Sequence, residues 1–207
     1  ILEMKGIYKA FPGIVAVDHV DLELEKGEVL ALIGENGAGK STLIKILSGA
    51  YTADDGTICV DGKEYRSYNT QEAIDLGIGI VYQELYYLGA MCIAENLFIG
   101  RVPTKGRLKK VDYKKLYADA KAVMEQFGLG HRDPAMEVSE LSVAEKQLVE
   151  IARAFTRDVK ILVMDEPTSA PNDVETENLF KLVRGMKERG VSIIYISHRL
   201  SEIFEIA

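Results

Sequence analysis

The sequence predicts an α/β fold that contains an inserted helical region. Three observations support this fold class: short apolar runs broken by turn residues fill the first third of the chain, the middle carries two amphipathic helical patterns, and the last stretch alternates strands with helices. With 207 residues, of which 47% are hydrophobic, the chain is long enough for one domain with a subdomain and a sizeable buried core.

Strands are expected in the first third because its apolar runs are short and end at turn signals. These strands are Leu22–Leu24, Val29–Ile33 and Thr57–Val60. Between the second and the third, Lys40–Gly49 places apolar residues at helical spacing and ends on glycine, which predicts a helix. A glycine-rich loop therefore lies between a buried strand and the start of a helix.

Helical periodicity dominates the middle of the chain. The segment Asp112–Phe127 places five residues on one face of a helix: Tyr113, Leu116, Ala120, Val123 and Phe127. A second amphipathic pattern covers Ser142–Phe155, and Gly100–Arg107 is expected to be a loop. The middle is therefore predicted to form a helical subdomain.

The last stretch returns to alternating strands and helices. Val159–Met164 and Val191–Ile196 are continuous apolar runs, as expected for parallel strands covered on both faces, and Asp173–Arg189 between them is an amphipathic helix. The expected domains are a core of residues 1–84 and 156–207 and a helical subdomain of residues 85–155.

Composition excludes several classes of function. Acidic residues outnumber basic residues 32 to 25, for a formal net charge of −7, which disfavours binding to nucleic acid. Cys59 and Cys92 have no metal-ligand spacing, so free thiols are expected rather than a disulfide or a zinc site. No apolar run approaches the ~18 residues that a membrane span requires.

Residues 34–41 match the phosphate-loop pattern G-x-x-x-x-G-K-[ST]. Its glycines allow successive backbone N–H groups to point at an anion beside a helix N-terminus. Lys40 is expected to hold the β- and γ-phosphates of ATP, and the Ser41 hydroxyl is expected to ligate Mg²⁺. A chance match in a glycine-rich turn is the alternative, which the strand before and the helix after disfavour. The expected nucleotide contacts are Gly34, Glu35, Asn36, Gly37, Ala38, Gly39, Lys40, Ser41 and Thr42.

A second apolar strand ends in two carboxylates, Asp165 and Glu166. Open α/β sheets bind ligands beyond the carboxyl ends of their strands, so Asp165 is expected in the Mg²⁺ shell. Glu166 is expected to act as the general base that polarises the attacking water. The alternative is a solvated Asp-Glu-Pro turn, which the presence of the phosphate loop in the same chain disfavours.

Three further positions are informative only in combination with these motifs. Gln83 and His198 each follow a strand, so Gln83 is placed to reach the metal or the water and His198 to reach the γ-phosphate. A surface role for Gln83 and a capping or core role for His198 remain open alternatives. Ser142 and Glu145 match the S-x-x-E capping box, which predicts a helix start.

In this order the residues resemble the nucleotide-binding domain of ABC transporters over nearly the whole chain. The matching segments are the phosphate loop Gly34–Thr42, the Q-loop Gln83, the signature Leu141–Glu145, the acidic pair Asp165 and Glu166, and the switch histidine His198. The resemblance also places Phe11 where the family stacks adenine. It implies a P-loop NTPase fold of ABC type, with a mixed-sheet core, an N-terminal antiparallel β part and an inserted helical subdomain that carries the signature.

Within the family the chain is most similar to the carbohydrate-importing branch, in which two ATP-binding domains are fused. The segments typical of that branch are Leu43–Gly49, Val81–Leu85, Ala94–Phe98 and Tyr195–Arg199. The resemblance implies an N-terminal domain, cut before its last strands and before the second domain, that is cytoplasmic and peripheral on the inner face of the membrane. No residue of the sequence identifies which sugar is carried.

Two segments depart from the family pattern. The signature is usually Leu-Ser-Gly-Gly-Gln, and here Val143, Ala144 and Glu145 replace its last three residues. Glu145 is expected to add negative charge where the γ-phosphate of a partner's ATP would dock, although it also strengthens the capping box. The segment Ser169–Asn172 lacks the Leu and the following acidic or hydroxyl residue that the family prefers, which puts communication between opposed sites in doubt.

The resemblance implies an ATP-hydrolysing subunit that energises sugar import through an integral-membrane permease. Two ATP-binding domains, fused or separate, would face each other head to tail, with Ser142 reaching the ATP of the partner domain. The implied catalytic residues are Glu166, His198, Gln83 and Lys40, and the implied metal ligands are Ser41, Gln83 and Asp165. A sugar-binding protein is an indirect partner, and no nucleic acid is expected. The alternatives are a soluble ABC-type ATPase without a permease and an ATP-gated binding module with negligible hydrolysis.

Overall fold

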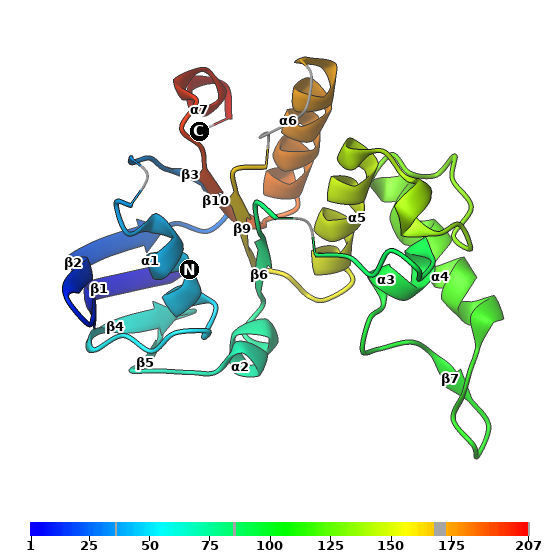
Figure 1. Cartoon of the computed structure of the whole chain (residues 1–207), viewed down its shortest axis with the longest axis horizontal. Helices are drawn as coiled ribbons and strands as arrows, with labels where there is room; N and C mark the ends of the chain where they lie inside the picture. The colour runs from blue at the N-terminus through cyan, green and yellow to red at the C-terminus, as the bar shows by residue number, and fades with distance from the viewer. Residues whose placement is uncertain (36, 85, 168–172, 207) are drawn as a thin grey trace. The chain divides into compact units, whose positions relative to one another are not determined.

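The computed structural model describes residues 1–35, 37–84, 86–167 and 173–206, together with the side chains of those residues other than 173–175. The chain forms two compact units (Figure 1). Unit 1 comprises Ile1–Gln83, Val159–Ser169 and Thr176–Ala207, and unit 2 comprises Glu84–Asp158 and Ala170–Glu175.

Unit 1 begins with an antiparallel sheet of four strands in the order β2-β1-β4-β5. The strands are β1 (Leu2–Phe11), β2 (Ile14–Leu24), β4 (Asp55–Val60) and β5 (Lys63–Tyr65). Alternate residues of β1, Leu2 and Met4, are buried, as a strand with one covered face requires. The expected strand at Leu22–Leu24 is the end of the longer β2.

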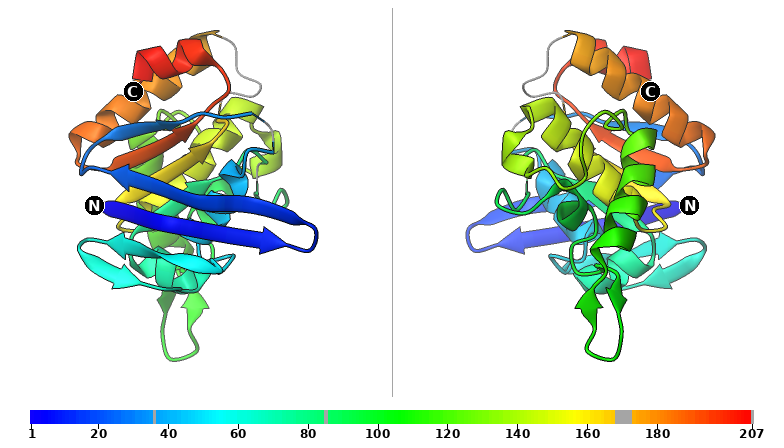
Figure 2. Two further views of the ribbon diagram at one scale, coloured as in Figure 1. Left: turned by 90° about the vertical axis from the view of Figure 1, so that its left-hand side faces the viewer. Right: turned by 90° about the vertical axis from the view of Figure 1, so that its right-hand side faces the viewer.

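The second sheet of unit 1 is wholly parallel, in the order β3-β10-β9-β6. Its strands are β3 (Val29–Leu32), β6 (Ile78–Val81), β9 (Ile161–Asp165) and β10 (Ser192–Ile196). Ile196 pairs with Leu32 on one side and with Asp165 on the other, so these three strands end level with one another. The loops that follow the strands therefore leave the sheet at one edge, as Figure 2 shows.

The helices of unit 1 are α1 (Lys40–Leu47), α2 (Thr70–Asp75), α6 (Asp173–Glu188) from Thr176 onward, and α7 (Leu200–Ile206). One cluster of buried residues joins α1 to both sheets: Ile44 and Leu47 of α1 pack with residues such as Met4 of the antiparallel sheet and Val163 of the parallel sheet. Burying α1 in this way fixes the start of the helix, and with it the glycine-rich loop, against the end of β3.

Unit 2 contains α3 (Ile93–Leu97), the short strands β7 (Thr104–Lys105) and β8 (Lys110–Val111), α4 (Tyr113–Gln126), a 3₁₀ turn (Val138–Glu140) and α5 (Val143–Phe155). The three α-helices pack on one another. In the described part of the chain, no helix has the length and apolar character that crossing a membrane requires.

Three expectations about unit 2 need correction. Tyr113 does not face inward: it lies at the start of α4 and is 47% exposed. Met124 is fully buried where Val123 was expected, because positions 116, 120 and 124 continue one helical stripe without a break. The segment 100–107, expected to be a loop, contributes β7 to an antiparallel hairpin with β8.

Candidate functional site

The glycine-rich loop connects β3 to α1 and depends on a glycine at the helix start. Gly39 is the N-cap of α1 with φ of 89° and ψ of −2°, a left-handed conformation. A Cβ at Gly39 would lie 2.3 Å from the Ala16 carbonyl oxygen, so no other residue fits without moving that backbone. Gly37 is also left-handed, with φ of 86°, but a Cβ there would meet nothing within 4 Å. Asn36 lies outside the described residues.

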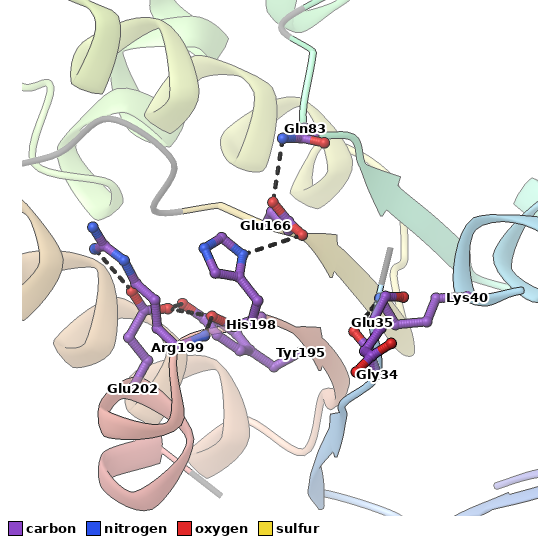
Figure 3. Close-up of polar contacts among 10 residues, drawn as sticks. Gly34, Glu35, Lys40, Gln83, Glu166, Tyr195, His198, Arg199 and Glu202 are labelled. Carbon is purple, nitrogen blue, oxygen red and sulfur yellow. Dashed lines mark hydrogen bonds and ion pairs between the residues drawn. The ribbon is translucent and has the colours of Figure 1, made fainter. Parts of the chain in front are cut away.

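Lys40 points back into the loop (Figure 3). Its ammonium donates to the Gly34 carbonyl at 2.5 Å and to the Glu35 carbonyl at 2.9 Å, while the Ala38 N–H donates to the Glu35 carbonyl at 3.1 Å. The cation therefore contacts two backbone carbonyls of the loop beside the N-terminus of α1. Such an arrangement of a positive charge and a helix N-terminus favours an anion.

Glu166 lies between Gln83 and His198 (Figure 3). These three residues follow three strands of the parallel sheet, β9, β6 and β10 respectively. Gln83 Nε2 donates to Glu166 Oε2 at 3.2 Å, and His198 Nδ1 lies 3.3 Å from Glu166 Oε1. The backbone of Glu166 is left-handed, with φ of 48°, and its N–H donates to the Ile196 carbonyl at 3.0 Å. The Glu166 side chain is 16% exposed, so solvent reaches the carboxylate.

Asp165 is the last residue of β9 and lies on the same edge as the phosphate loop. Burial raises the pKa of its carboxyl, and the neighbouring Glu166 adds to the rise, whereas Lys40 and Lys45 act in the opposite direction. A cation placed between Asp165 and the loop would favour the ionised carboxylate.

The proposed metal ligands suit Mg²⁺ by their chemistry. The Ser41 hydroxyl, the Asp165 carboxylate and the Gln83 amide all offer oxygen, the ligand that Mg²⁺ takes. Among the described residues, no group of three or more His, Cys, Asp or Glu side chains is placed to hold a metal without help. Mg²⁺ that keeps several waters and binds phosphate oxygens needs only one or two carboxylates from the protein, so a donor set with one carboxylate and two neutral oxygens fits it.

The loop that carries His198 is anchored by a residue that the sequence reasoning missed. Glu202 of α7 is buried and accepts hydrogen bonds from the Tyr195 hydroxyl at 3.2 Å and from the Ser197 hydroxyl at 2.9 Å. Arg199 Nη1 lies 3.3 Å from the other carboxylate oxygen, Oε1. These contacts hold both neighbours of His198, and Figure 3 labels Tyr195, Arg199 and Glu202 among them.

Phe11, the expected adenine platform, is at the end of β1 and is partly buried. Its ring meets the ring of Tyr51 edge-on, with centroids 5.6 Å apart, and the Lys9 ammonium lies 5.6 Å from its centroid. Tyr51 follows α1, so it is a second aromatic side chain near the end of the phosphate-loop helix.

Ser142 lies in unit 2, as the N-cap of α5, and the capping box is confirmed. The Ser142 hydroxyl accepts from the Glu145 N–H at 3.2 Å, and Glu145 Oε2 accepts from the Ser142 N–H at 2.9 Å. The charge of Glu145 is also paired: Arg132 Nε donates to Oε1 at 2.7 Å and Arg132 Nη2 to Oε2 at 3.1 Å. These bonds from Arg132 are the main reason that the pKa of Glu145 falls to about 2. The unbalanced charge expected at this position is therefore compensated by Arg132 within unit 2.

Another buried carboxylate connects the start of unit 2 to α5. Glu150 Oε1 accepts from the Tyr86 N–H at 2.7 Å and from Arg153 Nη2 at 3.0 Å, and Arg153 Nη1 donates to the Tyr86 carbonyl at 2.8 Å. Burial raises the pKa of Glu150. The helix that begins at Ser142 thus holds the backbone at Tyr86. The departure at Ser169–Asn172 lies outside the described residues, which end at 167 and resume at 173.

Comparison with known proteins gives consistent matches. The family model for ABC transporters matches residues 17–169. The galactose/methyl galactoside import ATP-binding protein MglA 1 of Photobacterium profundum is 47% identical over 206 residues, covering 100% of this chain and 41% of that protein. The ribose import ATP-binding protein RbsA of Clostridium perfringens is 48% identical, with the same coverage. The chain therefore spans about two fifths of the length of these relatives.

Solved structures confirm the predicted fold class. The ADP conformation of MJ1267, an ATP-binding cassette of an ABC transporter, is 31% identical with a TM-score of 0.87, covering 100% of this chain and 84% of that chain. MJ0796, a dimer bound to ADP and phosphate, is 22% identical with a TM-score of 0.82, covering 98% and 90%, and so shares the fold. Both the sequence match over most of the chain and this common α/β architecture lead to one conclusion: the chain belongs to the ABC transporter family.

Proposed function

We propose that this chain is the ATP-hydrolysing N-terminal domain of a sugar importer. One observation carries the proposal: Glu166 contacts both Gln83 and His198 on the sheet edge from which the phosphate loop also leaves. A general base, two polar residues that orient it and an anion-binding loop are the parts that phosphoryl transfer to water requires.

In the proposed mechanism the phosphates of ATP take the place of the loop carbonyls as partners of Lys40. Bound Mg²⁺, held by Ser41, Asp165 and Gln83, would offset the negative charge of the phosphate oxygens. Glu166 accepts a proton from water while the water oxygen bonds to the γ-phosphorus and the bond to the β–γ bridging oxygen breaks, giving ADP and phosphate. His198 hydrogen-bonds the γ-phosphate and keeps Glu166 in position.

The proposed partner in hydrolysis is a second ATP-binding domain. Ser142 and the N–H groups at the start of α5 would face the γ-phosphate bound by that domain, where a helix N-terminus favours negative charge. MJ0796, which shares the fold, is a dimer in its structure with ADP and phosphate. We propose a head-to-tail pair in which unit 2 is the helical subdomain and carries the signature.

We propose sugar import because similar proteins carry names that refer to sugar import. Proteins that match the whole chain at 47% and 48% identity are named for galactose/methyl galactoside import and ribose import. We place the chain at the cytoplasmic face of a permease, with the segment after Gln83 and unit 2 as the contact. The sugar itself would be selected by that permease and its binding protein.

The test compares ATP binding and phosphate release in the full-length protein, with and without its permease. Glu166→Gln should bind ATP as the wild type does and release no phosphate, because the amide cannot accept the proton of the water. Glu64→Gln, an exposed carboxylate on β5, is the matched control and should retain full activity. Undiminished turnover by Glu166→Gln would remove Glu166 from the base role.

The same assay separates the alternatives. A transport ATPase should release phosphate faster when its permease is present. A rate that the permease leaves unchanged would indicate a soluble ABC-type ATPase. ATP binding without phosphate release under either condition would indicate an ATP-gated binding module.

A further inference from the structure

The hairpin of β7 and β8 is a protruding part of unit 2. It lies between α3 and α4, and its turn is closed by the Lys109 N–H, which donates to the Gly106 carbonyl at 3.1 Å. Both views of Figure 2 show the hairpin, in green, extending away from the helices of its unit. Residues 104–110 are all exposed.

The segment that contains this hairpin is basic, although the chain as a whole is acidic. Residues 101–115 contain one acidic residue, Asp112, in a chain whose formal net charge is −7. The basic residues of the same segment are Arg101, Lys105, Arg107, Lys109, Lys110, Lys114 and Lys115. A cluster of positive charges on an otherwise acidic protein creates a local positive potential, which attracts an anionic surface to that part of the protein.

Three of these cations are occupied within unit 2. Lys105 pairs with Asp112 at 3.1 Å, Lys115 pairs with Asp119 at 3.2 Å, and Arg101 Nη1 donates to the Thr156 carbonyl at 2.9 Å. The remaining cations pair with no carboxylate of the described chain. They are Arg107, Lys109, Lys110 and Lys114.

Leu108 stands at the tip of the hairpin, between Arg107 and Lys109, and is 81% exposed. A large apolar side chain in that position contributes nothing to the core of unit 2. An exposed apolar residue flanked by cations is the composition of segments that lie at a membrane interface, where basic groups meet headgroups and apolar groups enter below them.

We propose that the β7–β8 hairpin binds the anionic headgroups of a lipid bilayer, with Leu108 entering the interface. The inference rests on the proposed function in one respect: a transporter subunit bound to its permease would bring the hairpin near a membrane. A protein loop is the poorer partner, because cytoplasmic loops of membrane proteins are rich in Lys and Arg and would repel the hairpin. Nucleic acid is also the poorer partner, since residues 104–111 offer no aromatic side chain for base stacking.

Flotation of the 207-residue chain with lipid vesicles tests the proposal without ATP or a permease. The chain should bind vesicles that contain phosphatidylglycerol, should not bind vesicles of pure phosphatidylcholine, and should dissociate when salt is raised. The variant R107Q/K109Q/K110Q removes three unpaired charges. At about fivefold per charge near an anionic surface, its partition coefficient should fall roughly a hundredfold.

Two further variants make the test specific. Leu108→Ser should weaken binding and keep its salt dependence. The control K26Q/R66Q/K187Q removes the same charge from exposed positions of unit 1 and should bind within about twofold of the wild type if the hairpin is the contact. Circular dichroism of all variants checks that each is folded.

Several results would overturn the inference. Equal binding to neutral and anionic vesicles would do so, as would an equal loss in the control variant. Intact vesicle binding by the hairpin variant, with loss of oligonucleotide or permease binding instead, would assign the hairpin to those partners. Phosphate release is measured separately, so failure of lipid binding is distinguishable from failure of the proposed ATPase.

Discussion

Replacing Arg132 by alanine should destabilise unit 2 through the first turn of α5. Arg132 makes two parallel hydrogen bonds to Glu145, at 2.7 Å and 3.1 Å, and Glu145 itself caps the helix through the Ser142 N–H. The Glu145 side chain is 14% exposed, whereas that of Arg132 is 36% exposed. Removing the guanidinium therefore leaves a mostly buried carboxylate without its main partner.

The expected loss is about 1–2 kcal/mol in the free energy of unfolding. Hydrogen bonds to a charged group contribute about 1.5–3 kcal/mol, and the partial exposure of Arg132 screens part of that. His131 Nε2 lies 3.3 Å from Glu145 Oε1 and would compensate only when it is protonated. The loss should be smaller than for a fully buried ion pair, which costs about 3–5 kcal/mol to break.

The effect should depend on pH in a defined direction. The pKa of Glu145 is lowered from its usual 4.5 to about 2 in the folded protein, chiefly by the hydrogen bonds from Arg132. A depressed carboxyl pKa stabilises the fold above the unfolded value and loses that contribution as pH falls through the folded value. The difference in stability between the wild type and Arg132→Ala should therefore be full above about pH 4.5 and shrink toward pH 2.

A double-mutant cycle measures the pair. Urea unfolding is compared for the wild type, Arg132→Ala, Glu145→Gln and the double variant. Glutamine at position 145 keeps the capping-box hydrogen bond and removes the charge, so the cycle isolates the ion pair from the cap. A coupling energy below about 0.3 kcal/mol at neutral pH would refute the argument, as would an effect that does not change with pH.

Two further predictions concern a glycine and a buried acid. Gly39→Ala should lower the free energy of unfolding by more than about 2 kcal/mol, because it adds a clash with Ala16 to the strain of the left-handed backbone. Gly37→Ala should lower it by about 1 kcal/mol, for the backbone strain alone. Equal melting temperatures of the two variants would contradict this prediction. Glu150→Ala should destabilise the chain by about 2–3 kcal/mol by removing the carboxylate that accepts from Arg153 Nη2 and from the Tyr86 N–H, and Glu150→Gln should cost less in the same urea assay. Because the pKa of Glu150 is raised, the wild type should lose stability relative to Glu150→Gln as pH rises above 4.5, and a gain would contradict the prediction.

The sequence predicted best where its signal is continuous. The apolar runs at 159–164 and 191–196 predicted two buried strands, and β9 and β10 lie there within two residues. The parallel topology then explains why Gln83, Glu166 and His198 meet, since residues after neighbouring parallel strands share one edge. The roles assigned to these residues stay proposals.

The sequence predicted least where the structure depends on contacts between distant segments. Arg132 lies in a loop with no periodicity, and nothing in the sequence links it to Glu145. Glu150 interrupts an apolar face of α5, and one of its carboxylate oxygens, Oε1, is paired in the buried site by the Tyr86 N–H and Arg153. The strands β7 and β8 are two residues long, too short for alternation to show.

The contacts of Glu166 and Lys40 suggest different requirements for binding and for chemistry. Glu166 takes its orientation from Gln83, His198 and its own left-handed backbone, so the proposed base is positioned by the chain itself. Lys40 is held by two carbonyls at 2.5 Å and 2.9 Å, which in the proposed mechanism it exchanges for phosphate oxygens. Preorganisation matters most for the group that acts in the transition state, whereas the exchange at Lys40 occurs once, on binding. Changes at Gln83 or His198 should therefore lower turnover more than they lower affinity for ATP, and changes at Lys40 should lower affinity.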